Sequence, residues 1–182
     1  ITFIDIEVST SSNKILDLGA VKDFDAEIHT PSQADFFYFT KDADFIGGHN
    51  ILNHDLKYLA HLGLEKKKAI DTLYLSPLMF PKRPSHKLLK DDKILSDALN
   101  NPLLDAQKSR DLFYDEVNAF NALDEDLQTI YFNLLKDSAE FKGFFEFLGY
   151  NAPAKGILRI FQSGSENKNT AKLIKKRFEG AI

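Results

Sequence analysis

Two acidic residues, Asp5 and Glu7, interrupt an apolar run near the start of the chain, residues 3–8 (FIDIEV). In a β-strand, side chains at positions i and i+2 lie on one face, so both carboxylates point the same way. Two like charges among apolar residues are costly unless an opposite charge cancels them, and Mg²⁺ and Mn²⁺ prefer carboxylate oxygens. The pattern indicates a metal site, although a strand end is the simpler interpretation of Asp-x-Glu taken alone.

A second Asp-x-Glu shows how weak the bare pattern is. Asp25 and Glu27 lie in a polar stretch and are interpreted as a solvated turn that leads into a strand. The first copy differs from it by its apolar flanks, and by further acids that the fold can bring to it.

Two such acids are expected at helix starts. Residues 48–59 (GHNILNHDLKYL) predict a strand that ends at a glycine pair, followed by a helix with Asp55 in its first turn. Residues 100–106 (NNPLLDA) place Asp105 in the first turn of a long helix. Complementing the helix dipole would explain each acid singly. As metal ligands, they would join Asp5 and Glu7 at the strand ends where α/β sheets place their sites.

The rest of the pattern predicts an α/β protein whose sheet is covered by helices. Thr30 is the expected N-cap of the first helix, with Pro31 at its first helical position, and Gly63 is the expected left-handed end of the second. Residues 77–84 are expected to form a loop, 88–99 a mixed helical segment, 151–165 a linker and 172–178 a basic amphipathic helix with a solvated face. Strands are expected at 1–8, 14–21, 44–49 and 69–73, and residues 23–30 are expected to form a turn and a short strand. The other helices are expected at 32–41, 53–62, 102–123, 127–135 and 139–148.

Composition limits the function classes. A chain of 182 residues with 43% hydrophobic residues can bury a core, which favours one domain or one domain with a helical extension. The absence of Cys excludes a disulfide framework and Cys-ligated zinc, and fits an intracellular, cytoplasmic setting. No signal peptide or membrane-spanning run is apparent, so no membrane partner is expected. A net charge of −4 argues against a protein that binds nucleic acid only through its own positive charge. It does not argue against an enzyme that binds phosphate through bound metal ions.

Taken in order over residues 1–123, these features resemble the DEDD superfamily of DnaQ-like 3′–5′ exonucleases, which have an RNase H-like fold. Asp5-Ile-Glu7 is similar to the first motif, and the run from His49 to Leu59 is similar to the second. Residues 71–73 (DTL) with the following helix resemble the segment before the third motif, which Asp105-Ala106 matches. The resemblance implies a mixed five-stranded sheet flanked by helices in a domain of residues 1–123, and a helical extension in residues 124–182.

A finer resemblance concerns possible partners. Residues 86–91 (HKLLKD) and 100–102 (NNP) are similar to exonuclease domains fused ahead of RecQ-type helicases. This likeness implies a helicase domain in the same chain, a role in DNA repair, and a nucleic-acid 3′ end as substrate, with DNA preferred to RNA.

The resemblance also implies a two-metal mechanism. Two Mg²⁺ or Mn²⁺ ions would activate a water and stabilise the leaving 3′ oxygen. The implied ligands are Asp5, Glu7, Asp55 and Asp105. The residues implied to bind substrate are Val8, Ser9, His49, Asn50 and Asn100.

The chain departs from the family pattern at three places. Val8-Ser9 replaces the common Thr-Thr-Gly, and the spacing from Asn50 to Asp55 is one residue longer than usual. The positions of the family's His or Tyr base hold Asn100 and Asn101, whose amides cannot take a proton from water. We expect this loss to slow the reaction by about 10²–10⁴-fold rather than abolish it.

A substitute base is conceivable at two histidines. His86 lies in the loop before the long helix, and we prefer it as a catalytic candidate to His54, because neighbours on a helix such as His54 and Asp55 face different ways. Three hypotheses stay open: an exonuclease, a weakened nuclease fold that binds nucleic-acid ends, and a protein-tethering module that works through its helical extension. Retention of all four acids favours the first, and the two asparagines favour the second.

Overall fold

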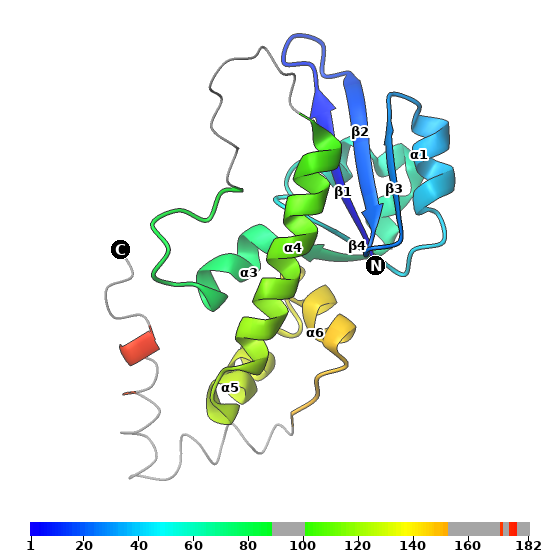
Figure 1. Cartoon of the computed structure of the whole chain (residues 1–182). Coiled ribbons are helices and arrows are strands. Elements are labelled where there is room, and N and C mark those ends of the chain that lie inside the picture. The colour runs from blue at the N-terminus through cyan, green and yellow to red at the C-terminus, as the bar shows by residue number, and fades with distance from the viewer. Residues whose placement is uncertain (89–100, 153–171, 173–174, 178–182) are drawn as a thin grey trace.

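The computed structural model describes residues 1–88, 101–152, 172 and 175–177. Its centre is a mixed five-stranded sheet with the strand order β3-β2-β1-β4-β5 (Figure 1). Strands β1, β4 and β5 run parallel to one another, whereas β2 is antiparallel to both β1 and β3. The sheet confirms the predicted fold class and has an RNase H-like arrangement. The strand bounds are Thr2–Val8 (β1), Ile15–Lys22 (β2), Ala26–Thr30 (β3), Phe45–Gly48 (β4) and Lys68–Asp71 (β5).

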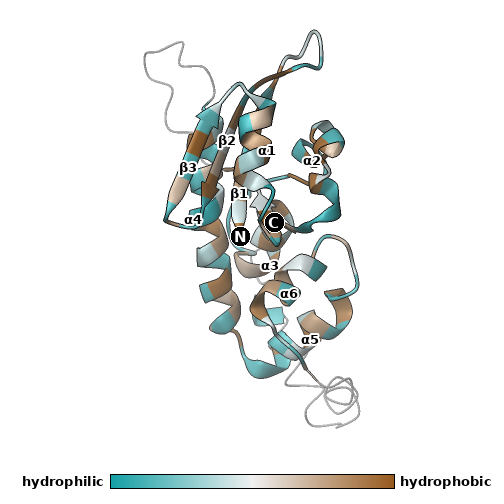
Figure 2. Cartoon of the chain, turned by 90° about the vertical axis from the view of Figure 1, so that its right-hand side faces the viewer, coloured by the Kyte–Doolittle hydropathy of each residue, from teal (hydrophilic) through white to brown (hydrophobic). Residues whose placement is uncertain are grey.

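Helices cover both faces of this sheet. In Figures 1 and 2, α5 and α6 gather at the end of α4 that is remote from α1 and β3. The α-helices are Gln33–Thr40 (α1), Asp55–Tyr58 (α2), Thr72–Met79 (α3), Pro102–Asn121 (α4), Glu125–Leu135 (α5) and Lys142–Leu148 (α6), and two 3₁₀ turns span Ala60–Leu62 and Leu64–Lys66.

Successive side chains of β1 point to opposite faces of the sheet, and each face packs into a hydrophobic core of its own. Ile4 and Ile6 pack into one core, together with Phe36 of α1. Phe3 points the opposite way, into a core in which its ring centroid lies 5.4 Å from that of Phe113 on α4. Because Asp5 and Glu7 follow Phe3 at two-residue steps, both lie on the α4 face of the sheet. The α4 face is therefore apolar at the start of β1 and acidic towards its carboxyl end.

The C-terminal helices extend the second core rather than forming a separate one. Phe144 of α6 packs edge-on against Phe120 of α4 at 5.4 Å between ring centroids. A Cβ atom on Gly143 would lie 1.9 Å from the carbonyl oxygen of Ala69, so α6 lies directly against β5. This contact covers a sheet edge that would otherwise expose unpaired backbone groups. The domain boundary expected at residue 123 stays a prediction.

The first helix begins later than its sequence signals predict. Thr30 still pairs with Leu18 in the β2–β3 ladder, so it cannot serve as the N-cap. Ser32 takes that role, and its Oγ accepts a hydrogen bond from the backbone N–H of Asp35 at 3.3 Å. The prediction of Thr30 and Pro31 at the helix start was wrong because the edge strand continues through Thr30.

Two further predictions are corrected around β4 and β5. The helix expected over residues 53–62 is only α2 followed by a 3₁₀ turn, although it ends at Gly63 with φ +74° as predicted. Of the loop expected at 77–84, residues 77–79 are instead the last turn of α3, on which Leu75 and Met79 are buried, and the loop begins only at Phe80. The segments expected at 88–99 and 151–165 lie mostly outside the described residues. Of the helix expected at 172–178, residues 172 and 175–177 are described and are helical.

None of the helices in the described ranges is long and apolar enough to cross a membrane.

Candidate metal site and its cavity

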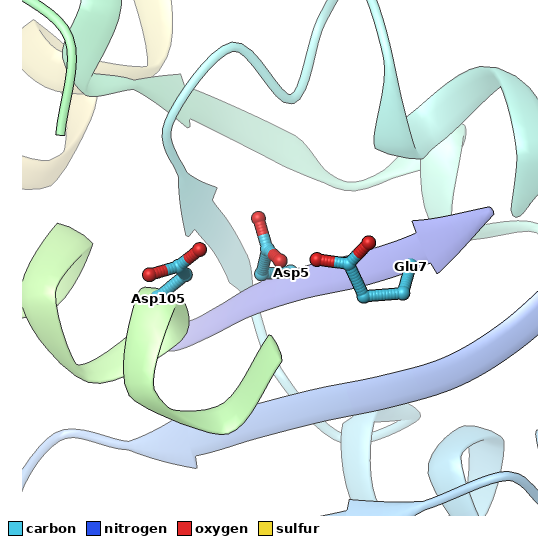
Figure 3. A group of neighbouring side chains, drawn as sticks. All are labelled: Asp5, Glu7 and Asp105. Carbon is cyan, nitrogen blue, oxygen red and sulfur yellow. The ribbon is translucent and has the colours of Figure 1, made fainter. Parts of the chain in front are cut away.

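Three carboxylates converge on the α4 face of the sheet. Asp5, Glu7 and Asp105 each offer one oxygen, and these oxygens all lie within 4.8 Å of one another. Figure 3 shows the first two projecting from β1 and the third from the first turn of α4. All three side chains are partly buried. At such a separation each pair repels by about 3 kcal/mol at an effective dielectric constant of about 20, so a bound divalent cation would stabilise the cluster.

The close approach of α4 to the sheet completes this cluster. Gly19 of β2 pairs with Asp5 of β1, and a Cβ atom on Gly19 would lie 2.3 Å from the carbonyl carbon of Pro102. The start of α4 therefore lies directly on β2 beside Asp5. Asn101 fixes this start, because its Oδ1 accepts hydrogen bonds from the N–H groups of Leu103 at 3.1 Å and Leu104 at 3.3 Å.

Asn101 thus has a structural role at one of the two positions where the resemblance places a base. Its side chain caps α4 and puts Asp105 into the first turn. Asn100, at the other base position and the fifth expected substrate contact, lies outside the described residues.

Asp55 lies beside the cluster but is not one of its three members. The residue is only 1% exposed, and its Oδ1 accepts a hydrogen bond of 2.9 Å from the backbone N–H of Ile6, the residue between Asp5 and Glu7. Its Oδ2 lies 3.6 Å from Nδ1 of His54. The three clustered acids could hold one divalent cation, and Asp55 is a fourth carboxylate in the same cavity.

A cavity of about 650 Å³ contains all four acids. His49 and Asn50, two of the expected substrate-binding residues, line it as well. Val8 and Ser9 follow Glu7 at the end of β1 without joining the lining. The full lining is Asp5, Ile6, Glu7, His49, Asn50, His54, Asp55, Leu73, Lys87, Leu88 and Asp105.

The two candidate histidine bases occupy different places. His86 is not among the residues that line the cavity, and its Nδ1 lies 2.9 Å from Oγ of Ser76 on α3. His54 does line the cavity, with its ring partly exposed. The carboxylate of Asp55 raises the pKa of His54 above its ordinary value, with a smaller contribution from Glu7. Of these two imidazoles, the structure therefore brings only His54 to the acids.

His49 is held as a neutral ring. Burial, and secondarily the neighbouring His86, lowers its pKa to about 4. Its Nδ1 lies 2.9 Å from Oγ1 of Thr72, which in turn donates a hydrogen bond of 3.2 Å to the carbonyl of Gly48. Because the Thr72 proton points to Gly48, Nδ1 of His49 carries its own proton. His49 therefore keeps Nε2 as a hydrogen-bond acceptor.

Asp71 organises the turn that carries His49 and Asn50, a role that our sequence analysis missed. Its fully buried carboxylate accepts hydrogen bonds from the N–H groups of Asn50 at 2.7 Å, Leu73 at 3.0 Å and Leu52 at 3.1 Å. Asn50 has a φ of +67°, a left-handed conformation that costs energy in any residue other than glycine. Burial raises the pKa of Asp71. The signal in the sequence that could have indicated this role of Asp71 is an acid at the end of a short strand, directly before a helix.

Comparisons of the chain with protein-family models, curated proteins and solved structures find no match. The function is therefore inferred from the geometry of the cavity and from the order of its acids along the chain.

Proposed function

We propose that this protein is a metal-dependent 3′–5′ exonuclease that hydrolyses phosphodiester bonds at nucleic-acid 3′ ends, DNA in preference to RNA. The observation that carries the proposal is the convergence of Asp5, Glu7 and Asp105 within 4.8 Å. The cluster lies on a mixed sheet with the order β3-β2-β1-β4-β5, inside a cavity that also contains Asp55. Partly buried like charges at this distance have no use in a simple scaffold, whereas a metal-dependent hydrolase needs them.

The proposal assigns a role to each group that lines the cavity. Asp5, Glu7 and Asp105 would hold one divalent cation, and Asp55 would help to hold a second through Oδ2. Bound Mg²⁺ or Mn²⁺ supplies the positive charge that acidifies a water and stabilises the departing 3′ oxygen. Neutral His49 offers an acceptor to a sugar hydroxyl, and Lys87 offers a positive charge to a phosphate.

A weakened nuclease fold that binds nucleic-acid ends, or tethers other proteins, is the second candidate. The observation in its favour is that the Asn101 side chain is engaged as a helix cap rather than available for proton transfer. We expect slow turnover rather than none, since a general base typically contributes about 10²–10⁴-fold.

A titration with Mn²⁺ or Mg²⁺ on 5′-labelled single-stranded DNA tests the proposal. We expect a ladder of products shortened from the 3′ end, and no cleavage after chelation. Asp5→Asn and Glu7→Gln should abolish cleavage and remove the rise in melting temperature that Mn²⁺ causes. Asp25→Asn and Glu27→Gln, in the second Asp-x-Glu, are the matched controls and should change neither.

Cleavage that persists in both Asp5→Asn and Glu7→Gln would contradict the nuclease proposal. Metal-independent binding of the labelled DNA without cleavage would support the end-binding alternative. If the protein neither binds nor cleaves the labelled DNA, the tethering module is the hypothesis that remains.

A further inference from the structure

A second cavity, of about 300 Å³, adjoins the metal cavity. The two share Lys87 and Leu88, which line both. We call this second cavity the basic groove. Its lining is Arg83, Lys87, Leu88, Lys108, Asp111, Leu112 and Asp115.

The basic groove follows one face of α4 away from the clustered acids. Asp105, Lys108, Leu112 and Asp115 succeed one another at steps of three or four residues, which places them along one side of a helix. Lys108 lies about 4.5 Å along the helix axis from Asp105. A chain molecule whose end occupies the metal cavity would therefore meet Lys108 one helical turn further on.

Three cations, Arg83, Lys87 and Lys108, line this path against two acids, Asp111 and Asp115. Asp111 is already paired with Arg110, whose Nη2 lies 2.8 Å and whose Nε lies 2.9 Å from Oδ1 of Asp111. The metal cavity has the opposite character, because four carboxylates line it alongside Lys87.

Arg83 is held in place before any ligand binds. Its guanidinium carbon lies 3.8 Å from the centroid of the Phe80 ring, and its backbone N–H donates to the carbonyl of Phe80 at 3.0 Å. A guanidinium stacked on a ring keeps its N–H edge for a phosphate and loses little freedom when it binds.

We propose that the basic groove binds the phosphate backbone of a single DNA strand on the 5′ side of the nucleotide held in the metal cavity. This inference rests on the proposed exonuclease function. A one-sided row of cations that leads out of an active site matches the way proteins track single strands, through charge rather than base identity. The substrate is then a single-stranded 3′ end, with Arg83, Lys87 and Lys108 on successive phosphates.

Two substrates separate this inference from the function itself. The p-nitrophenyl ester of thymidine 5′-phosphate fills only the metal cavity, whereas a single-stranded oligonucleotide reaches the basic groove as well. In the double variant Arg83→Gln, Lys108→Gln, which keeps the shared Lys87, we expect KM for the oligonucleotide to rise about tenfold or more, with kcat little changed. Hydrolysis of the ester should stay within about a factor of two, because the ester makes no contact in the groove.

Direct binding gives a second readout. Fluorescence anisotropy with the labelled oligonucleotide and Ca²⁺ measures affinity against salt concentration. The slope of log K against log salt should fall by about 0.7 for each lost phosphate contact, so by about 1.4 in the double variant. The control variant Lys136→Gln, Lys142→Gln loses the same charge outside the groove and should keep the wild-type slope. Circular dichroism melts check that both variants fold.

The outcomes are distinguishable. If the wild type hydrolyses neither substrate, the proposed function fails, and the anisotropy slopes still decide whether the groove binds a strand. If hydrolysis occurs but the double variant keeps the wild-type KM and slope, or if ester and oligonucleotide lose activity equally, the groove assignment is wrong and the function stands.

Discussion

A Cβ atom on Gly19 would lie 2.2 Å from the backbone nitrogen of Leu103, so β2 and the first turn of α4 are in direct backbone contact. Gly19 is also the cross-strand partner of Asp5. The missing side chain on β2 is what lets Asp105, two residues beyond Leu103, reach the acids on β1. The candidate metal site therefore depends on a residue that offers no ligand to a metal.

The first prediction concerns this contact. Gly19→Ala forces backbone atoms apart, so we expect Mn²⁺ affinity to fall markedly and the free energy of unfolding to drop by about 1–3 kcal/mol, as for other overpacked sites. Calorimetric titration with Mn²⁺ and urea denaturation measure the two effects. Gly149→Ala is the control, because it introduces strain at φ +58° with open space around it, at the end of α6. Equal loss of Mn²⁺ affinity in both variants would contradict the positional role of Gly19.

The second prediction separates the two oxygens of Asp55. In Asp55→Asn the amide oxygen can still accept from the N–H of Ile6, so stability should stay near the wild type while cleavage falls with the lost charge. Asp55→Ala leaves that buried N–H without its acceptor, which should cost about 1–3 kcal/mol. Urea denaturation and the cleavage assay report on the two roles. Full activity in Asp55→Asn would show that its charge is not needed.

Local signals predicted the parts of the site that depend on local geometry. The two-residue period of β1 placed Asp5 and Glu7 on one face, and the sequence Asn-Pro placed Asp105 in the first turn of α4. The hydrogen bond from Ile6 to Asp55 joins residues 49 positions apart, and no local pattern predicts it. The same holds for the contact of Gly19 with α4, which depends on how two elements pack.

The turn after β4 shows a related limit. Its residues suggested an early helix start, yet the carboxylate of Asp71 binds the N–H groups of Asn50 and Leu52 and holds a turn there. The helix accordingly begins only at Asp55. The side chain that holds this turn lies about twenty residues further along the chain. The local sequence pattern around the turn does not include it, so that pattern alone could not predict the interaction.

The third prediction tests Asp71 as the residue that positions this turn. Asp71→Ala removes three hydrogen bonds to a buried carboxylate, so we expect a loss of stability of at least about 1–3 kcal/mol. Asn50 is then free to leave its left-handed conformation, and the lining of the cavity changes shape. KM should therefore rise further than in a variant that loses the same stability elsewhere. Met79→Ala, which loses buried volume elsewhere on α3, is the control of similar destabilisation. Equal KM values in the two variants would reduce Asp71 to a purely structural residue.

The last prediction concerns Glu116 on α4, which is fully buried and whose two oxygens have no hydrogen-bond partner among the described residues. Burial raises the pKa of its carboxyl from an ordinary 4.5 to about 10; nearby Arg83 lowers the pKa, while Asp71 and Asp115 raise it. Between these two values the folded protein holds a proton that the unfolded chain has lost. Stability should therefore fall as pH rises through this range, by at most about 1.4 kcal/mol per pH unit from this group.

Glu116→Gln keeps the shape of the side chain without an ionisable proton, so it should flatten this dependence. Urea denaturation between about pH 6 and pH 9 measures the slope in each variant. Asp137→Asn, which removes an exposed acid outside α4, is the control and should retain the wild-type slope. If Glu116→Gln and the wild type lose stability in parallel, the carboxyl is already compensated in the folded state. A flatter slope would show that α4, which presents Asp105 to the metal site, contains a protonated acid at neutral pH.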